Sequence, residues 1–190
     1  MEKTPKKLNL GCGRDIKEGY INLDTTKLPG VDVVWNIKKL PLPFKNEEFE
    51  EILCNDILEH FGNYVPVLKE LYRILSSDGK LKIRVPHFTS RNNYSDPTHR
   101  RLFSVSTFDF FVKGTRINKE KGRDYYFDFH FEKIASLKIT FEKHIFLIRT
   151  INNYIIEPLV NSSRKMQDFY ETTGCSRIFP GQNVLIELVK

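Results

Sequence analysis

Short runs in which hydrophobic and polar positions alternate fill the first half of the chain, and this pattern predicts β-strands. The predicted strands are residues 7–10, 20–23, 31–35, 51–54 and 80–85. Between the last two, apolar residues recur at helical spacing from Val67 to Leu75, after a proline suited to a first helical position and before the stop sequence of residues 76–79. A separate helical turn is predicted over residues 56–61. Strands that alternate with helices indicate an α/β protein with a parallel sheet.

The second half of the chain has a different pattern. A polar, aromatic stretch at about 87–128 is followed by an alternating strand in which Leu137, Ile139 and Phe141 share one face. The final strand is predicted over residues 184–189, and helices are predicted over 151–160 and 164–172. We expect the last two strands to pair antiparallel, with these helices inserted between them. Without a repeat or a linker, residues 1–190 are predicted to form one domain with an insertion at about 87–128.

The first strand ends in a glycine-rich turn, Leu8-Asn9-Leu10-Gly11-Cys12-Gly13. Such a turn lets the backbone approach a nucleotide-like ligand at the carboxyl end of a central strand. Ile16 stands where a third glycine would complete the dinucleotide fingerprint, which disfavours a pyrophosphate cradle. The second strand ends in Asp24, whose carboxylate can accept hydrogen bonds from a ribose diol. Two adjacent strand ends are therefore predicted to bind one ligand.

At these residues the chain resembles the class I S-adenosylmethionine-dependent methyltransferases, specifically the compact type with an L-N-L-G-C-G first motif. The resemblance covers residues 8–88. Besides the first motif, it rests on Ile21-Asn22-Leu23-Asp24, residues 35–44, residues 49–55, Leu58-Glu59-His60, and residues 71–75 with Asp78-Gly79 and the strand to Pro86. It implies a Rossmann-like, doubly wound and mostly parallel sheet of about seven strands, with the last strand antiparallel. It also implies S-adenosylmethionine as cofactor.

Candidate cofactor-binding residues follow from the resemblance position by position. They are Gly11, Cys12, Gly13, Asp24, Asn36, Ile37 and Asn55. The resemblance implies that the glycine turn lies against the methionine part, Asp24 at the ribose, Asn36 and Ile37 beside the adenine, and Asn55 near the methionine part or the sulfonium. Cys12 is interpreted as the small residue that the turn needs, without thiol chemistry. Family members usually carry Asp or Glu at the position of Asn36, whose side-chain oxygen can still accept a hydrogen bond.

The connection from Gly11 to Gly19 is nine residues long, fewer than the dozen or more that a parallel crossover usually needs. The first crossover helix is therefore predicted to be reduced or lost. Fully covered parallel strands are apolar on both faces, whereas here Leu81 and Ile83 alternate with Lys82 and Arg84. One face of the sheet is predicted to be thinly covered and partly solvated, or met by a second subunit in a homodimer.

Candidate catalytic residues lie in and just before the insertion. His87 directly follows the fifth strand, and Asp96 and His99 could form a carboxylate and imidazole pair that takes a proton from the acceptor. The alternative for Asp96 is a turn or helix cap before Pro97, with His99 hydrogen-bonded locally. His60 is interpreted as a brace for the ligand loop. No spacing among the histidines and cysteines predicts a metal site.

Composition narrows the choice of acceptor. The net charge is +6, from 30 basic and 24 acidic residues, which permits an anionic partner without requiring one. A sugar or small-metabolite hydroxyl is favoured as acceptor, so the predicted partner is a small molecule or glycan. The alternative is a noncatalytic cofactor-binding or nucleic-acid-binding protein that uses a basic surface loop, Lys113 to Arg123.

Cellular location is predicted from the cysteines and from hydropathy. The three cysteines form no Cys-x-x-Cys pair, which argues against a disulfide framework and favours the reducing cytoplasm. No apolar run approaches the ~20 residues of a membrane span, so no membrane association is expected.

Overall fold

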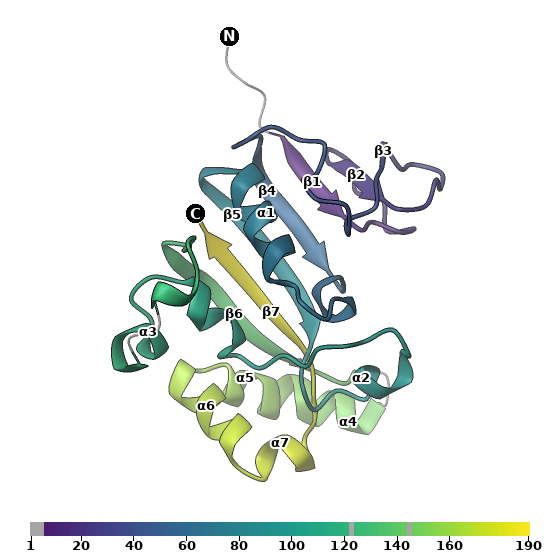
Figure 1. Ribbon diagram of the computed structural model, residues 1–190. Coiled ribbons are helices and arrows are strands. Elements are labelled where there is room, and N and C mark those ends of the chain that lie inside the picture. Colours follow the sequence, from purple (N-terminus) through teal and green to yellow (C-terminus); the bar gives the residue numbers. More distant parts are fainter. Residues whose placement is uncertain (1–5, 122–123, 144–145) are drawn as a thin grey trace.

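The computed structural model describes residues 6–121, 124–143 and 146–190, and contains one seven-stranded sheet of order β3-β2-β1-β4-β5-β7-β6 (Figure 1). The strands are β1 (Lys7–Leu10), β2 (Ile21–Asp24), β3 (Val33–Val34), β4 (Phe49–Asn55), β5 (Leu75–Pro86), β6 (Lys133–Phe141) and β7 (Gly181–Val189). β1 to β5 pair parallel, and β7 runs antiparallel to both of its neighbours, β5 and β6. The α/β, Rossmann-like fold with an antiparallel last strand is thereby confirmed.

The helices are short. They are α1 (Val65–Ile74), α2 (Asn92–Ser95), α3 (Arg116–Lys121), α4 (Phe146–Ile151), α5 (Glu157–Val160), α6 (Arg164–Thr172) and α7 (Cys175–Ile178). Three 3₁₀ helices, η1 (Leu58–His60), η2 (Thr107–Phe111) and η3 (Asp124–Tyr126), and a π-helical segment, η4 (Asn152–Ile156), complete the described elements. None of the helices in the described ranges is long and apolar enough to cross a bilayer.

Helix α1 is the crossover between β4 and β5, and it lies over these strands in Figure 1. Its apolar stripe, which includes Val67, Leu68 and Leu71, is fully or almost fully buried in the main core. The helix ends at Ile74, and Leu75 turns to an extended conformation and pairs with Phe49 of β4. Leu75 is thus the start of a strand, although its spacing predicts the last turn of the helix.

A loop replaces the helix in the first crossover, as the short Gly11–Gly19 connection predicts. Two buried amides fix this loop. Asn9 Nδ2 donates to the carbonyl of Asp15 (2.8 Å) and to Asn22 Oδ1 (3.0 Å). Asn22 Oδ1 also accepts from the amide of Lys17 (2.9 Å), and its Nδ2 donates to the Lys17 carbonyl (3.1 Å). Side chains from β1 and β2 therefore satisfy backbone groups of the loop that a helix would satisfy internally.

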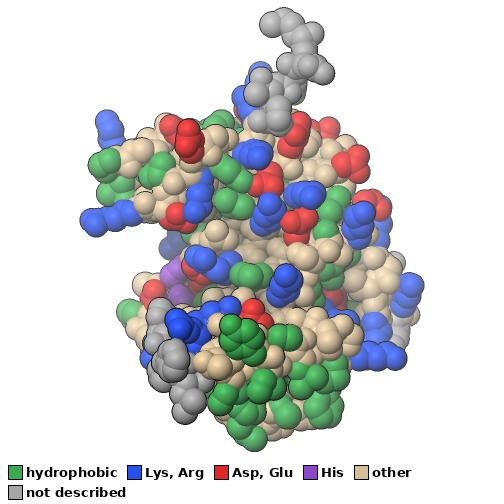
Figure 2. All heavy atoms as spheres, turned by 180° about the vertical axis from the view of Figure 1, so that it is seen from behind, with side chains coloured by type: hydrophobic (Ala, Val, Ile, Leu, Met, Phe, Trp, Pro, Cys, Tyr) green, Lys and Arg blue, Asp and Glu red, His purple; other side chains and the backbone are tan. Residues whose placement is uncertain are grey.

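The face of the sheet opposite α1 carries charged side chains in pairs. Figure 2 views the molecule from this side and shows basic and acidic groups interspersed over the upper part. Lys82 Nζ lies 2.7 Å from Glu51 Oε2, and Lys80 Nζ lies 3.3 Å from Glu187 Oε1 on the neighbouring strand. The side chains of Lys82 and Arg84 are 40% and 41% exposed. This half-solvated state agrees with the prediction of a thinly covered face.

The segment from residue 87 to 128 packs on the core through aromatic rings. Phe103, Phe108 and Phe111 are buried, and the rings of Phe103 and Phe108 stack with centroids 5.8 Å apart. The predicted basic loop within this segment is a loop only in part, because Arg116–Lys121 forms α3. Its last basic residue, Arg123, lies outside the described residues.

Helices α4 to α7 connect β6 to β7 and lie beyond the carboxyl end of β6 (Figure 1). The predicted helix over 164–172 matches α6, which begins after an N-cap in which Ser163 Oγ accepts from the amide of Met166 (3.2 Å). A second, smaller core forms where α5 and α6 pack against β6. It contains Val105, Ile139, Phe141, Val160 and Tyr170.

Candidate cofactor and acceptor site

The glycine turn follows β1 at the carboxyl edge of the sheet. Gly11 has φ +64°, and a Cβ built there would lie 2.1 Å from Ile57 Cδ1 and 3.7 Å from Ile37 Cδ1. A left-handed conformation and close neighbours both require glycine at this position. Ile57 directly precedes η1, so the predicted cofactor turn lies against the segment that leads into the 3₁₀ helix.

Asp24 joins the ends of β1 and β2. Its Oδ2 accepts a hydrogen bond from the amide of Gly13 (2.9 Å), and its Oδ1 accepts from the amide of Thr26 (2.8 Å). Each carboxylate oxygen can accept a further bond, so the side chain retains capacity for a ribose hydroxyl. The hydrogen bond from Gly13 to Asp24 brings the ends of the two strands together, and the prediction that they bind one ligand stays a prediction.

The remaining predicted cofactor residues lie around the same turn. Ile37 is half-buried and contacts the main core, whereas Asn36 is exposed and its Oδ1 accepts from the amide of Lys38 (2.9 Å). Asn55 ends β4, where it pairs with Arg84. Burial, followed by the charge of Asp24, raises the pKa of the Cys12 thiol. The thiol is therefore held in its neutral form, which fits the structural interpretation of Cys12.

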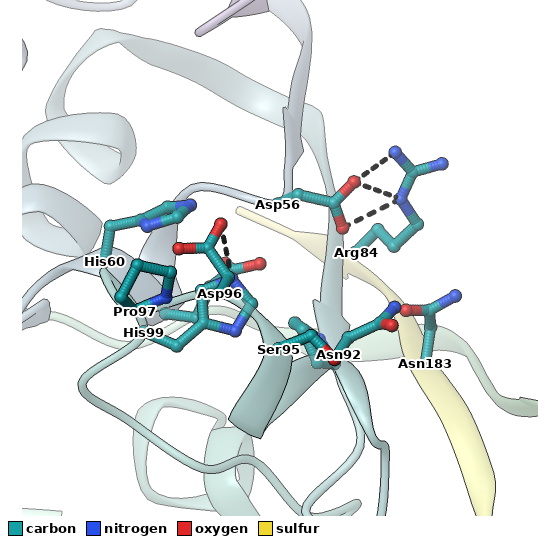
Figure 3. A pocket seen from close by; sticks show the side chains of 11 residues that line it. Asp56, His60, Arg84, Asn92, Ser95, Asp96, Pro97, His99 and Asn183 are labelled. Carbon is teal, nitrogen blue, oxygen red and sulfur yellow. Dashed lines mark hydrogen bonds and ion pairs between the residues drawn. The ribbon is translucent and has the colours of Figure 1, made fainter.

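A cavity of about 500 Å³ opens at the carboxyl ends of β4 and β5 (Figure 3). One of its lining residues, Asp56, directly precedes Ile57, which lies against Gly11. The lining residues are Asp56, Glu59, His60, Arg84, Pro86, Asn92, Ser95, Asp96, Pro97, His99 and Asn183. On one side, Arg84 Nε donates to both carboxylate oxygens of Asp56 (3.0 Å each). Asp56 has φ +56° and directly follows Asn55, so this ion pair lies beside the predicted cofactor residues.

His60, Asp96 and His99 lie together on the other side of the cavity (Figure 3). Asp96 Oδ1 accepts from the amide (2.8 Å) and the hydroxyl (2.6 Å) of Thr98, which is the turn-capping role weighed as the alternative. Its other oxygen, Oδ2, lies 3.7 Å from His99 Nε2. Asp96 thus caps the turn and faces the imidazole at the same time.

The structure holds His87 away from the cavity. The ring is fully buried, Nδ1 lies 2.7 Å from Thr89 Oγ1, and Nε2 lies 3.0 Å from Glu171 Oε1. The same glutamate oxygen accepts from the amide of Val105 (2.8 Å). Both ring nitrogens are engaged, so this geometry favours a role in tying α6 to the end of β5 over the predicted role as a base.

Two cavity residues had no predicted catalytic or binding role. Glu59 lies in the matched Leu58-Glu59-His60 motif, yet nothing in its sequence context shows that its side chain is buried. His60 was interpreted as a brace, and it does bind Thr98 (2.8 Å), but its ring also lies 4.8 Å from that of His99, measured between centroids. The amides of Arg100 and Arg101 bind the carbonyl of Glu59 (2.7 and 3.2 Å) and bring the two segments together. For Glu59 and His60, the matched Leu58-Glu59-His60 motif was the sequence signal, as the Asp96 and His99 pair was for the opposite segment.

Comparison with known proteins bears on the domain and the fold of the chain. Residues 8–83 match the family model described as a methyltransferase domain. An uncharacterized protein of Methanocaldococcus jannaschii is 28% identical over 96% of this chain and 77% of its own length.

Two solved structures share the fold. An S-adenosylmethionine-dependent methyltransferase from Archaeoglobus fulgidus superposes with a TM-score of 0.57 at 19% identity, covering 99% of this chain and 87% of that one. A methyltransferase candidate from Bacillus halodurans gives a TM-score of 0.58 at 19% identity, covering 99% and 94%.

The domain match covers residues 8–83, and the whole chain shares its fold with S-adenosylmethionine-dependent methyltransferases. S-adenosylmethionine is the cofactor of this class. The residues at the turn fit that group, because Gly11 allows close backbone approach and the Asp24 carboxylate retains hydrogen-bonding capacity at the ends of β1 and β2.

Proposed function

We propose that this chain is a compact class I methyltransferase that methylates a hydroxyl group of a sugar or small metabolite. The observation that carries the proposal is the cavity of about 500 Å³, whose lining includes the His99 imidazole and the Asp96 carboxylate 3.7 Å apart. Its size suits a small acceptor. In this proposal residues 1–190 act as one domain, and the segment 87–128 forms the acceptor side.

The chain's own residues orient the reactants and handle the proton. S-adenosylmethionine supplies an activated methyl group on a sulfonium. Gly11, Gly13, Asp24, Ile37 and Asn55 hold the cofactor, with Asn36 near the adenine. A ring nitrogen of His99 accepts the proton of the acceptor hydroxyl, and Asp96 orients the ring from 3.7 Å.

Burial, followed by the nearby His60, lowers the pKa of His99. The ring is therefore neutral at physiological pH, as a proton acceptor must be.

Calorimetric titration with S-adenosylmethionine and S-adenosylhomocysteine tests the cofactor site. We expect micromolar binding that Asp24→Ala weakens at least tenfold, because it removes the carboxylate that joins the ends of β1 and β2. Asp15→Ala is the matched control, since Asp15 lies in the same loop but its side chain is 62% exposed and pairs with Lys17 at the surface. Equal affinity of all three proteins would refute the site assignment.

Turnover with a panel of sugar and small-metabolite hydroxyl acceptors tests the acceptor side. Release of S-adenosylhomocysteine should fall at least a hundredfold in His99→Ala, while cofactor affinity stays within about twofold. His130→Ala is the control histidine, outside the cavity. Cofactor binding without turnover on any acceptor would favour the alternative of a noncatalytic binding protein.

The cellular location remains a proposal of the same kind. Cys12 and Cys54 are buried free thiols, and Cys175 is a third free thiol. Free thiols are typical of a reducing compartment, so we place the protein in the cytoplasm.

A further inference from the structure

Glu59, His60 and His99 converge in the wall of the cavity. One potential ligand atom from each lies within 4.8 Å of the other two. Glu59 and His60 are neighbours on η1, whereas His99 comes from a turn 39 residues further along the chain. This separation explains why spacing alone predicts no metal site, although the fold assembles two nitrogen donors and a carboxylate.

The carboxylate of Glu59 is the first sign that a ligand belongs here. The side chain is fully buried (0% exposed), and neither Oε1 nor Oε2 has a hydrogen-bond partner. Leaving a buried carboxyl without a partner costs free energy, which a bound cation would recover.

The ring of His60 is oriented as a metal-binding histidine usually is. Its Nδ1 lies 2.8 Å from Thr98 Oγ1, and that hydroxyl donates to Asp96 Oδ1 at 2.6 Å. With Nδ1 donating to the threonine, Nε2 is the unprotonated nitrogen. A hydrogen bond from the second ring nitrogen to an oxygen acceptor is the common support for a histidine ligand.

His99 completes the set. Its Nδ1 is buried and has no hydrogen-bond partner, while its Nε2 faces Asp96 Oδ2 at 3.7 Å. The ring therefore has one unused nitrogen and a carboxylate on the other side. Asp56 and Asp96 add negative charge to the same cavity, although Arg84 balances that of Asp56.

We propose that Glu59, His60 and His99 bind a divalent first-row transition-metal ion, such as Zn²⁺, in the wall of the acceptor cavity. Two imidazoles and one carboxylate suit such an ion, whereas Mg²⁺ and Ca²⁺ prefer all-oxygen sites. Donors on one zinc ion lie about 3.4 Å apart, so small side-chain rotations close the 4.8 Å set. Three protein ligands leave a coordination position open to the cavity.

The use of this ion rests on the proposed function, but its binding does not. An acceptor hydroxyl in the open position would lose its proton to solvent water more readily, because a bound cation lowers the pKa of a coordinated oxygen. With the ion bound, His99 is a ligand and no longer the proton acceptor. The same three residues would then position the acceptor oxygen beside the cofactor turn.

Calorimetry with metal-free protein and Zn²⁺, without cofactor or acceptor, tests the site. We expect one ion per chain with micromolar or tighter affinity, and no comparable binding of Mg²⁺. Glu59→Gln, His60→Ala and His99→Ala should each weaken Zn²⁺ binding at least tenfold, and His130→Ala should not. Co²⁺ provides a second readout, because its visible absorption should report mixed nitrogen and oxygen ligation in wild type and be lost in His99→Ala.

Folding is checked separately, by melting each variant in the presence of a chelator. Glu59→Gln keeps the shape of the side chain and should melt close to the metal-free wild type, while Zn²⁺ should raise the melting temperature of the wild type only. A wild type that binds no Zn²⁺, or variants that bind it as wild type does, would overturn the proposal. Because cofactor binding is measured on its own, a protein that binds S-adenosylmethionine but not Zn²⁺ would disprove only this inference.

Discussion

Among the glycines of the described residues, Gly11 is the one at which an added methyl group would come closest to a neighbouring side chain. A Cβ at this position would overlap Ile57 Cδ1 at 2.1 Å and would stand on a backbone with φ +64°. Gly11→Ala should therefore lower the free energy of unfolding by about 2–4 kcal/mol, of which the left-handed backbone accounts for about 1–2 kcal/mol. Cofactor affinity should fall at least tenfold, because Ile57 must move at the turn. Urea unfolding and calorimetry measure the two effects.

The control for this variant is Gly19→Ala. Gly19 also has a positive φ, +76°, but nothing lies within 4 Å of its added Cβ. We expect the backbone cost alone and unchanged cofactor affinity. Equal losses in both variants would show that contact with Ile57 is unimportant.

Asp109 gives the stability of the protein a pH-dependent component. Burial raises its pKa to about 6, even though Arg164 Nη2 lies 2.8 Å from Oδ2. The folded state then holds this proton more tightly than the unfolded state, so the stability contributed by the group is present at low pH and is lost as pH rises through about 6. Between pH 5 and 7.5 the loss should be about 1 kcal/mol.

Asp109→Asn removes this titration. The difference in unfolding free energy, wild type minus variant, should therefore decrease from pH 5 to 7.5 in urea denaturation experiments. A difference that stays constant, or that increases with pH, contradicts the raised pKa.

At the scale of elements, two asparagines replace a crossover helix. Asn22 is buried and bonds the backbone of Lys17 through both its Oδ1 and its Nδ2. Asn22→Ala removes the acceptor of the Lys17 amide and one hydrogen bond each from the Lys17 carbonyl and Asn9 Nδ2, so we expect a loss of about 2–3 kcal/mol in the free energy of unfolding. The amide of Lys17 should also exchange its hydrogen faster.

Lys82→Ala, on the face of the sheet opposite α1, is the comparison variant. Its ion pair with Glu51 is half-exposed, and such pairs contribute less than about 1 kcal/mol. If Lys82→Ala lowers the free energy of unfolding more than Asn22→Ala does, the ion pair of Lys82 stabilises these strands more than the buried amides of Asn9 and Asn22 do.

The sequence predicted the elements better where their residues interact locally. Strand β1 and helix α6 match their predicted ranges, because alternation and an N-cap serine are local signals. The predicted strand at 31–35 is reduced to Val33–Val34, because it lies at the sheet edge with one neighbour. β5 begins at Leu75, before its predicted start, because pairing with Phe49 overrides the helical spacing.

The candidate site likewise has a part that the sequence predicts and a part that depends on contacts between distant segments. The glycine turn and Asp24 belong to adjacent strand ends, so their proximity follows from parallel pairing. The convergence of Glu59 and His99 depends on backbone hydrogen bonds from Arg100 and Arg101 to Glu59, which no periodicity in the sequence encodes. The buried state of His87 likewise depends on Glu171, 84 residues away.

At the scale of the whole molecule, the positive charge is partly compensated where it is densest. Lys113 pairs with Glu132, and Arg116 lies 3.8 Å from Asp168. A small acceptor does not need these residues, so the double variant Lys113→Gln and Lys119→Gln should keep turnover within about twofold. Its affinity for RNA should stay in the weak, nonspecific range of about 10⁻⁴–10⁻⁶ M, as for wild type.

Filter binding at several salt concentrations measures this affinity. Nanomolar binding by wild type that falls steeply with salt and disappears in the double variant would favour the nucleic-acid alternative.

The narrow connection between the two parts of the sheet has a consequence for ligand binding. Within the sheet of the described residues, β1, β2 and β3 join the other strands through the four paired residues of β1 and β4. The predicted cofactor residues lie on both sides of this connection, with Gly11 and Asp24 on one and Asn55 on the other. A ligand that contacts residues on both sides links the two parts of the sheet. Bound cofactor should therefore slow the local unfolding of β1, β2 and β3. The cofactor then stabilises the fold as well as taking part in the reaction.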